Sequence, residues 1–169
     1  MAIRLLLQGM KTMNITLRKA TFDECAEIHK LQVASFTELL KKYNDIETNP
    51  ATETLQTIKH KFNQVFTTYY FIMANDVKIG AVRLVKLSGT ACRISPIFIL
   101  PEYQNKGYAR KAMHALEAEF SDVVEWNLDT IKQEEKLCYF YEKLGYKRTG
   151  KDEDIKPGMT IAYYQKIIN

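Results

Sequence analysis

The chain has 169 residues, of which 46% are hydrophobic and 26% are charged, and its formal net charge is +4. This composition is that of a soluble globular domain, so a fibrous or largely disordered chain is excluded, and the length suits one domain with one core. The charges are interspersed without a block of five like charges, so a nucleic-acid-binding tail is not indicated. The modest basic excess favours an anionic ligand.

The N-terminal residues 1–13 read MAIRLLLQGMKTM. Their apolar patch is too short to span a bilayer, and it lacks the cleavage site of a signal peptide. We therefore expect residues 1–13 to be a tail or extension outside a single domain of residues 14–169, with no membrane partner. Cys25, Cys92 and Cys138 lack the number and spacing of a disulfide framework or a zinc site. Free buried thiols in a reducing cytoplasm are expected, and no metal.

The first part of the chain is predicted to be a strand followed by helix. Residues 14–20 alternate apolar and polar side chains, as a half-buried strand does. Thr21 and Glu24 have the spacing of a capping box at a helix start. Apolar residues then recur with helical spacing, which leaves open a second helix or a continuation of the first; they are Phe36, Leu39, Leu40 and Tyr43.

A further helix and a hairpin are predicted next. Asn49 can cap this helix, with Pro50 at its first position. Residues 66–74 and 77–87 are rich in β-branched and aromatic side chains, and the turn between them predicts a hairpin. The apolar stripe of the helix consists of Leu55, Ile58, Phe62 and Val65.

The second half of the chain alternates strands and helices, so the fold class is mixed α/β with about seven strands. Pro96 predicts a bulge within its strand, and Gly145 suits a left-handed helix C-terminus. Residues 91–130 are expected to form a right-handed parallel crossover. The predicted order is strand 91–100, a helix from Ala109 to Phe120, strand 123–130, a helix over 137–144, and strands 146–149 and 159–167 around a loop at 150–158.

The turn that follows strand 91–100 carries the strongest chemical signal. It reads Gln104-Asn105-Lys106-Gly107-Tyr108-Ala109 and is followed by Arg110 and Lys111. The first amides of a helix have no internal partner and lie at the positive end of the helix dipole, so such a turn can bind a phosphate or pyrophosphate. Taken alone, the turn also fits an ordinary strand–helix connection.

Residues 104–109 resemble the Q/R-x-x-G-x-G/A motif of the GNAT N-acetyltransferase superfamily, and they stand between an apolar strand and an Ala/Met/Leu helix, as in that family. A second block, CYFYEKLGYK at residues 138–147, resembles the family's C-terminal block, one strand further along. The resemblance implies a GNAT-like fold. In that fold a central mixed seven-stranded sheet is splayed between strands 4 and 5, with about four to five helices on both faces.

The resemblance also implies acetyl-CoA as the co-substrate, bound between the two splayed strands. The pantetheine arm would pair with the main chain of Ile97, Phe98 and Ile99. Glu134 stands where the family often has an asparagine that contacts the coenzyme, so this position departs from the pattern. The pyrophosphate would lie on the amides of Gln104, Asn105, Lys106, Gly107, Tyr108, Ala109 and Arg110.

The implied reaction is direct attack of an amine on the thioester. The resemblance makes Tyr141 the general acid that protonates the leaving thiolate, and the backbone N–H of Phe98 the oxyanion donor. Tyr141 also fits an apolar helix position with no chemical role. Strand 91–100 contains no carboxylate. The general base is therefore solvent or one of Asp45, Glu47, Glu53 and Asp129.

The acceptor remains open between a small-molecule amine and a protein N-terminus. Acidic loop residues around the expected acceptor site, namely Asp45, Glu47, Glu53 and residues 152–154, favour a cationic amine through steering. A non-catalytic coenzyme A-binding regulatory module is the alternative, because strand 91–100 lacks a carboxylate and Glu134 replaces the asparagine. The expected enzyme is bacterial-type and cytoplasmic, and a homodimer is considered because family members are often dimers.

Overall fold

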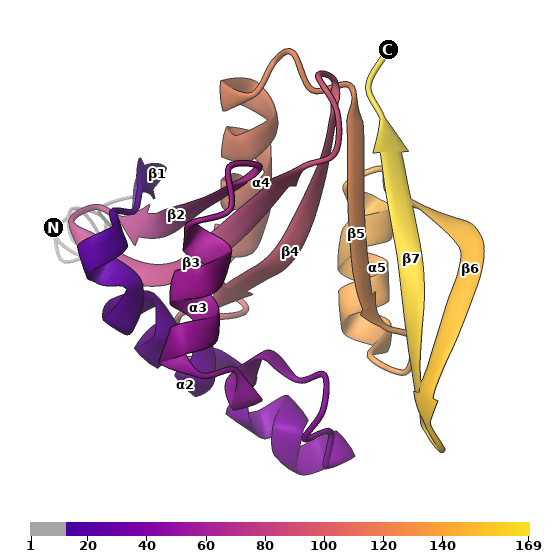
Figure 1. Cartoon of the computed structure of the whole chain (residues 1–169). Helices are drawn as coiled ribbons and strands as arrows, with labels where there is room; N and C mark the ends of the chain where they lie inside the picture. Colours follow the sequence, from indigo (N-terminus) through magenta and orange to yellow (C-terminus); the bar gives the residue numbers. More distant parts are fainter. Residues whose placement is uncertain (1–12) are drawn as a thin grey trace, which may run out of the picture.

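Seven strands form one mixed sheet in the order β1-β2-β3-β4-β5-β7-β6, in a computed structural model that describes residues 13–169 (Figure 1). The tail predicted for residues 1–13 therefore lies outside the described residues, apart from Met13. The strands are β1 (Ile15–Lys19), β2 (Thr67–Ala74), β3 (Val77–Lys86), β4 (Ala91–Ile99), β5 (Glu125–Ile131), β6 (Lys147–Lys156) and β7 (Met159–Ile167).

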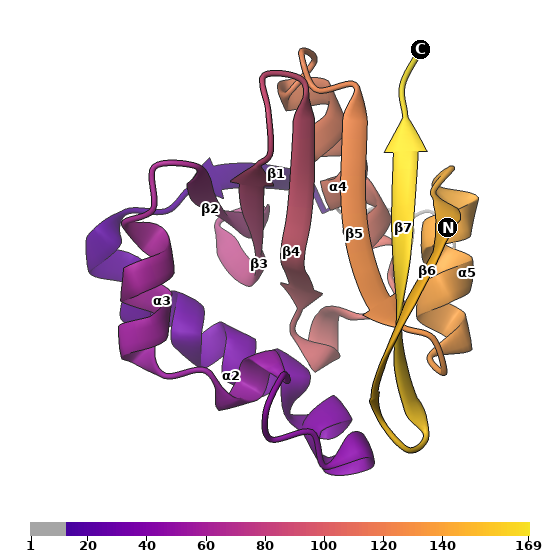
Figure 2. The ribbon, with the colours of Figure 1, turned by 45° about the vertical axis from the view of Figure 1, so that its right-hand side comes forward.

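Four α-helices lie on the two faces of this sheet, as predicted. Helices α2 and α3 cover one face of β2–β4, whereas α4 and α5 lie on the opposite face (Figures 1 and 2). The helices are α2 (Cys25–Tyr43), α3 (Leu55–Phe62), α4 (Tyr108–Glu119) and α5 (Glu135–Lys143), and three 3₁₀ turns are η1 (Phe22–Glu24), η2 (Pro50–Thr52) and η3 (Pro101–Tyr103).

The hydrophobic core is continuous on the α4/α5 face and partial on the other. On the α4/α5 face one cluster joins β3, β4, α4, β5 and α5 through Leu84, Ile94, Met113, Trp126 and Tyr141. On the α2/α3 face a second cluster lies under α2 and α3 only. In the part of the chain that the structure describes, no helix covers that face of β5, β7 and β6 (Figure 2). Half of one sheet face is therefore open beside α2.

Strands β4 and β5 are parallel but paired over a short distance. Their pairs are Ala91 with Glu125, Cys92 with Trp126 and Arg93 with Asn127, and beyond them the strands diverge (Figure 2). The predicted splay between strands 4 and 5 is thus confirmed. The register between β3 and β4 shifts opposite the cis Ser95–Pro96 peptide, which confirms the bulge predicted at Pro96.

The first helices differ from the prediction in their boundaries. Thr21 and Glu24 form the predicted capping box, but it caps η1, which leads into one uninterrupted α2, so the continuation is the correct alternative. Asn49 caps η2, and α3 begins only after Thr54, whose hydroxyl accepts from the N–H of Thr57. Val65, placed on the apolar stripe, lies beyond α3 and is fully exposed.

The loop predicted at residues 150–158 is wrong. Strand β6 continues to Lys156, and only Pro157 and Gly158 form the turn to β7. The charged residues of β6 are exposed on both faces of this edge strand. Because neither face is buried, the strand has no apolar–polar alternation from which it can be predicted.

Gly80 tests how closely β3 lies against β4. A Cβ added to Gly80 would lie 2.1 Å from the carbonyl oxygen of Phe98, a main-chain atom that no rotamer change can move. We expect Gly80→Ala to lower the free energy of unfolding in urea by about 2–3 kcal/mol. Gly89→Ala, with nothing within 4 Å of the added Cβ, should change it by no more than about 0.5 kcal/mol. Equal losses in the two variants would contradict this packing.

Candidate active site

The open edge of β4 presents main-chain groups that alternate along the strand. The N–H of Leu100 donates to the carbonyl of Ile79 at 2.8 Å, and Phe98 is paired with Ala81 two residues further along the ladder. Because hydrogen-bonded pairs alternate in an antiparallel ladder, the main-chain groups of Phe98 point at β3. Those of Ile97 and Ile99 point at the splay.

A side-chain contact supports this alternation independently. The amide nitrogen of Gln104 donates to the carbonyl of Ile99 at 2.8 Å, on the side away from β3. In this ladder the N–H of Phe98, the expected oxyanion donor, is turned toward β3, whereas the N–H of Ile97 is turned toward the splay. The side chain of Phe98 is buried against α2, edge-on to Phe36 with ring centroids 5.6 Å apart.

The turn between β4 and α4 has the backbone of an anion-binding loop. Gly107 is the N-cap of α4 with φ 80°, and Asn105 is also left-handed with φ 59°. Residues 104–107 are exposed, and the first turn of α4 directs its unpaired amides outward from Tyr108 onward. The sequence motif therefore forms a left-handed turn at the N-terminus of α4. This arrangement favours the binding of phosphate.

Tyr141 lies on the side of α5 that faces the core. It is 8% exposed and contacts Tyr146 and Tyr164, with ring centroids 6.0 and 6.4 Å away. Among residues 13–169 its hydroxyl forms no hydrogen bond, so it has a proton to donate to a ligand. Burial, and secondarily the charge of Asp129, raise the pKa of Tyr141. The hydroxyl is therefore protonated at neutral pH.

Glu134 connects the two halves of the molecule. Its Oε1 accepts from the hydroxyl of Tyr43 at 2.6 Å and from the ammonium of Lys42 at 2.5 Å. Burial raises the pKa of Glu134, but these hydrogen bonds and the charge of Lys42 outweigh it and lower the pKa below its usual value. Beside it, Lys156 donates to the carbonyl of Asn44 at 3.1 Å. We call the contact of Lys42 and Tyr43 with Glu134 the clasp.

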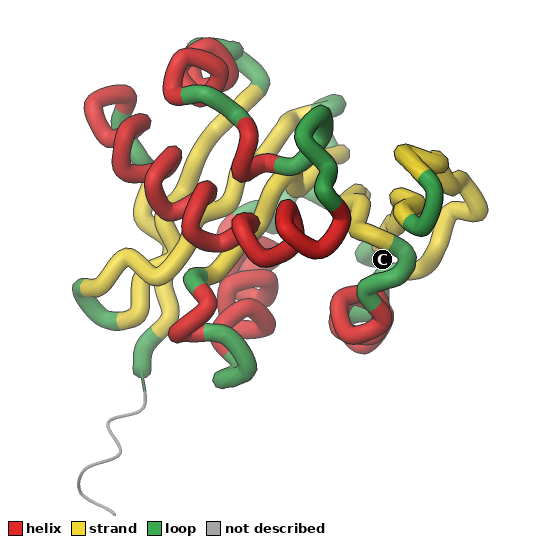
Figure 3. Tube along the Cα trace, turned by 90° about the horizontal axis from the view of Figure 1, so that it is seen from below, coloured by secondary structure: helices red, strands yellow, loops and turns green. Residues whose placement is uncertain are grey.

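The clasp joins the end of α2 to the start of α5. Helix α2 runs along the lower side of the molecule toward the β6–β7 hairpin (Figure 3). The two halves of the sheet are thus held at both ends, by the β4–β5 pairs and by the clasp. The coenzyme contact expected for Glu134 was drawn from the family pattern, whereas the clasp depends on partners 91 and 92 residues away that no local pattern indicates.

The acidic residues expected near the acceptor are mostly used within the protein. Asp45 is 3% exposed, and its carboxylate accepts from the N–H and hydroxyl of Thr48, so it shapes a turn. Glu47 is exposed in the same turn. Asp129 accepts from Arg93 at 2.5 Å on the open sheet face, beside the splay. The fourth candidate, Glu53, pairs with Lys61 of α3, so of the four carboxylates only Asp129 is bonded beside the β4–β5 junction.

The described residues hold no group of three or more His, Cys, Asp or Glu side chains arranged for a metal ion. The three cysteines are free and buried, as predicted. No helix within residues 13–169 has both the length and the apolar character needed to cross a membrane.

Comparison with known proteins gives a consistent result. The family model of the acetyltransferase (GNAT) domain matches residues 32–168. The uncharacterized protein YrkN of Bacillus subtilis (strain 168) is 27% identical over 143 residues, which cover 81% of this chain and 77% of YrkN.

Solved structures share the fold. RimL, a ribosomal L7/L12 alpha-N-protein acetyltransferase in complex with coenzyme A, aligns with a TM-score of 0.72 and 12% identity over 95% of this chain and 97% of its own. The spermidine N-acetyltransferase from Vibrio cholerae, in complex with CoA and spermine, aligns with a TM-score of 0.71 and 19% identity over 90% of this chain and 95% of its own.

Substitutions in the clasp should show how much each of its two bonds contributes to the free energy of unfolding. Tyr43→Phe removes a partly buried hydrogen bond to a carboxylate, so we expect a loss of about 1.5–3 kcal/mol in the free energy of unfolding. Lys42→Gln removes an ion pair whose lysine side chain is 57% exposed, so the loss should be clearly smaller than that of Tyr43→Phe. Urea titrations measure both values, and a larger loss for Lys42→Gln would contradict the arrangement.

Proposed function

The chain belongs to the GNAT acetyltransferase family and is an acyltransferase, and on that premise we propose that it transfers the acetyl group of acetyl-CoA to a primary amine. The observation that carries the proposal is the open main-chain edge of β4, which leads directly into the left-handed turn at the start of α4. An extended thioester with a diphosphate at its far end matches such a strand edge followed by an anion site.

The residues present fit coenzyme A. The N–H and carbonyl of Ile97 and the N–H of Ile99 are available to the amides of pantetheine, while the carbonyl of Ile99 is already bound by Gln104. The amides from Asn105 to Arg110 would hold the pyrophosphate, and Lys106 and Arg110 would add charge. Glu134 is engaged in the clasp, so in this proposal it positions α5 and does not contact the coenzyme.

Acetyl transfer forms a C–N bond and breaks a C–S bond. The N–H of Ile97 donates to the oxygen of the thioester carbonyl as negative charge develops there. Tyr141 donates its proton to the departing thiolate and regains one from solvent. The proton of the attacking amine goes to water on the open sheet face. The second carboxylate oxygen of Asp129 is left to hold the amine, because its other oxygen is bound to Arg93.

The structural neighbours do not identify the amine, because they differ in acceptor: RimL is named for a protein N-terminus and the Vibrio cholerae enzyme for spermidine. The acidic loop residues expected to attract a cationic amine are partly neutralised within the protein. Asp45 is buried, Glu53 pairs with Lys61 and Asp152 pairs with Lys132. These contacts favour an acceptor of moderate charge, either a small amine or a peptide N-terminus.

Tyr141→Phe tests the proposed general acid. We expect kcat for thiol release from acetyl-CoA to fall about 100-fold or more, with coenzyme A affinity unchanged in a calorimetric titration. Tyr139→Phe is the matched control, because Tyr139 is on the same helix but 62% exposed, and it should keep full activity. Tight coenzyme binding without turnover of any amine by the unaltered protein would instead favour a non-catalytic coenzyme-binding module.

Gly107→Ala and Gly158→Ala form a matched pair for the pyrophosphate site. Both glycines have positive φ, +80° and +82°, and an added Cβ would meet no atom within 4 Å. Each substitution should cost about 1–2 kcal/mol of stability, because a side chain is strained in this conformation. Only Gly107→Ala should also weaken coenzyme A binding, by about tenfold or more, equivalent to about 1.4 kcal/mol. Equal affinities for the two variants would contradict the proposed site.

A further inference from the structure

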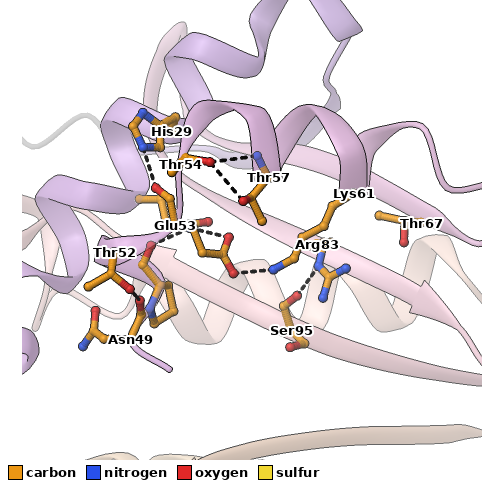
Figure 4. Close-up of polar contacts among 12 residues, drawn as sticks. His29, Asn49, Thr52, Glu53, Thr54, Thr57, Lys61, Thr67, Arg83 and Ser95 are labelled. Atoms are coloured by element: carbon orange, nitrogen blue, oxygen red, sulfur yellow. Dashed lines mark hydrogen bonds and ion pairs between the residues drawn. The ribbon is translucent and has the colours of Figure 1, made fainter. Parts of the chain in front are cut away.

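Arg83 is a half-buried cation without a carboxylate partner. Its Nε donates to the carbonyl of Ser95 at the bulge of β4 (Figure 4). Within residues 13–169 no ion pair involves Arg83, and its two terminal nitrogens make no hydrogen bond. Arg83 is only partly buried, so part of its side chain is exposed to solvent. The planar fork that ordinarily binds a carboxylate is therefore available to a ligand.

The neighbouring acids do not neutralise Arg83. The carboxylate of Glu53 already accepts from Lys61 (Figure 4) and from Gln32. Asp129 is paired with Arg93. Three cations, Lys61, Arg83 and Arg93, therefore face two carboxylates, which leaves one positive charge in excess. Burial lowers the pKa of Arg83, as expected where a charge lacks a counter-ion.

A second polar group beside Arg83 also lacks a partner. Tyr69 is paired with Arg83 across β2 and β3, and it is 1% exposed. Its hydroxyl is buried without a hydrogen-bond partner in the described chain. Buried hydroxyls are normally satisfied, by protein or by an ordered water. An anion or a water held by the Arg83 fork would provide that partner.

Arg83 is close to the proposed reaction centre. The carbonyl it binds belongs to Ser95, which is only two residues before Ile97 along β4. Arg93, which precedes the bulge along β4, lies on the same face of the sheet as Arg83. Its guanidinium donates a hydrogen bond to the carboxylate of Asp129. An anion on Arg83 and an amine on Asp129 would thus lie on the same side of the sheet, Arg83 on β3 beside α3 and Asp129 on β5, where no described helix covers the strand.

We propose that the acceptor is a carboxylate-bearing amine, an amino acid or a short peptide, whose carboxylate binds the guanidinium of Arg83. The proposal rests on the proposed acetyl transfer and specifies its substrate class. Arg83 acts as a specificity-determining residue: it places the acceptor so that the amine faces Ile97. A polycation without an acid group would meet the excess positive charge of Arg83 and Arg93 and is disfavoured.

The test compares each acceptor with its own amide. Thiol release from acetyl-CoA is measured with glycine and glycinamide, alanine and alaninamide, and glycylglycine and glycylglycinamide. Amidation also changes the basicity of the amine, so the quantity that matters is the acid-to-amide ratio of kcat/KM in each variant. We expect Arg83→Gln to lower this ratio about tenfold or more, through loss of activity on the acids alone. The amino-acid and dipeptide arms show which source of the carboxylate is used.

Two variants control the comparison. Arg18→Gln removes a surface arginine on β1 that pairs with Glu24, and it should leave the ratio unchanged. Arg83→Lys keeps the charge without the fork, and it should lower the ratio less than Arg83→Gln does. It also replaces Arg83→Gln in the comparison if loss of the bond to Ser95 prevents folding. An acid-to-amide ratio that is the same with and without Arg83 overturns the proposal.

A binding experiment separates failure of this inference from failure of the proposed function. N-acetylglycine and N-acetylglycinamide are titrated into the coenzyme A-bound protein. If no amine is turned over, the acetyl transfer proposed above fails, but tighter binding of the acid that is lost in Arg83→Gln still supports the anion site. Equal binding of acid and amide, in the protein with Arg83, overturns it.

Discussion

The structure depends on the unequal pairing of β4, which has a full partner on one side and almost none on the other. Along β3 its ladder is continuous apart from the bulge, whereas along β5 only Ala91, Cys92 and Arg93 are paired. Main-chain groups beyond Arg93 therefore need another partner. The carbonyl of Ile99 finds one in Gln104. The open main-chain groups of Ile97 are the feature on which the proposed coenzyme site depends.

Two features keep the strands apart without separating the halves of the molecule. The core beneath the splay is shared, because Trp126 of β5 and Met113 of α4 belong to the same cluster. On the far side the clasp ties Tyr43 to Glu134. The gap between β4 and β5 therefore has the shared core on one side and the hydrogen bond between Tyr43 and Glu134 on the other. Such a frame keeps a binding site open before any ligand arrives, which reduces the ordering cost of binding.

The sequence predicted those features that depend on neighbouring residues. The capping box of Thr21 and Glu24, the bulge at Pro96 and the left-handed position of Gly145 each follow from local backbone chemistry. Features set by tertiary contacts were not predictable. The direction of the Phe98 N–H depends on ladder phase, and the partners of Glu134 are on a distant helix. That Arg83 has no carboxylate partner among the described residues can be seen only when the positions and partners of the neighbouring carboxylates, Glu53 and Asp129, are known.

Strand β6 has a further consequence for how the protein behaves in concentrated solution. It is an outer strand of the sheet, ten residues long, and such a strand offers a free row of main-chain donors and acceptors to other molecules. Its run from Lys151 to Asp154 is charged throughout. Alignment of a second polypeptide along β6 would strip water from these charges. The charged residues that hide β6 from sequence-based prediction therefore also protect the protein against fibrous self-association.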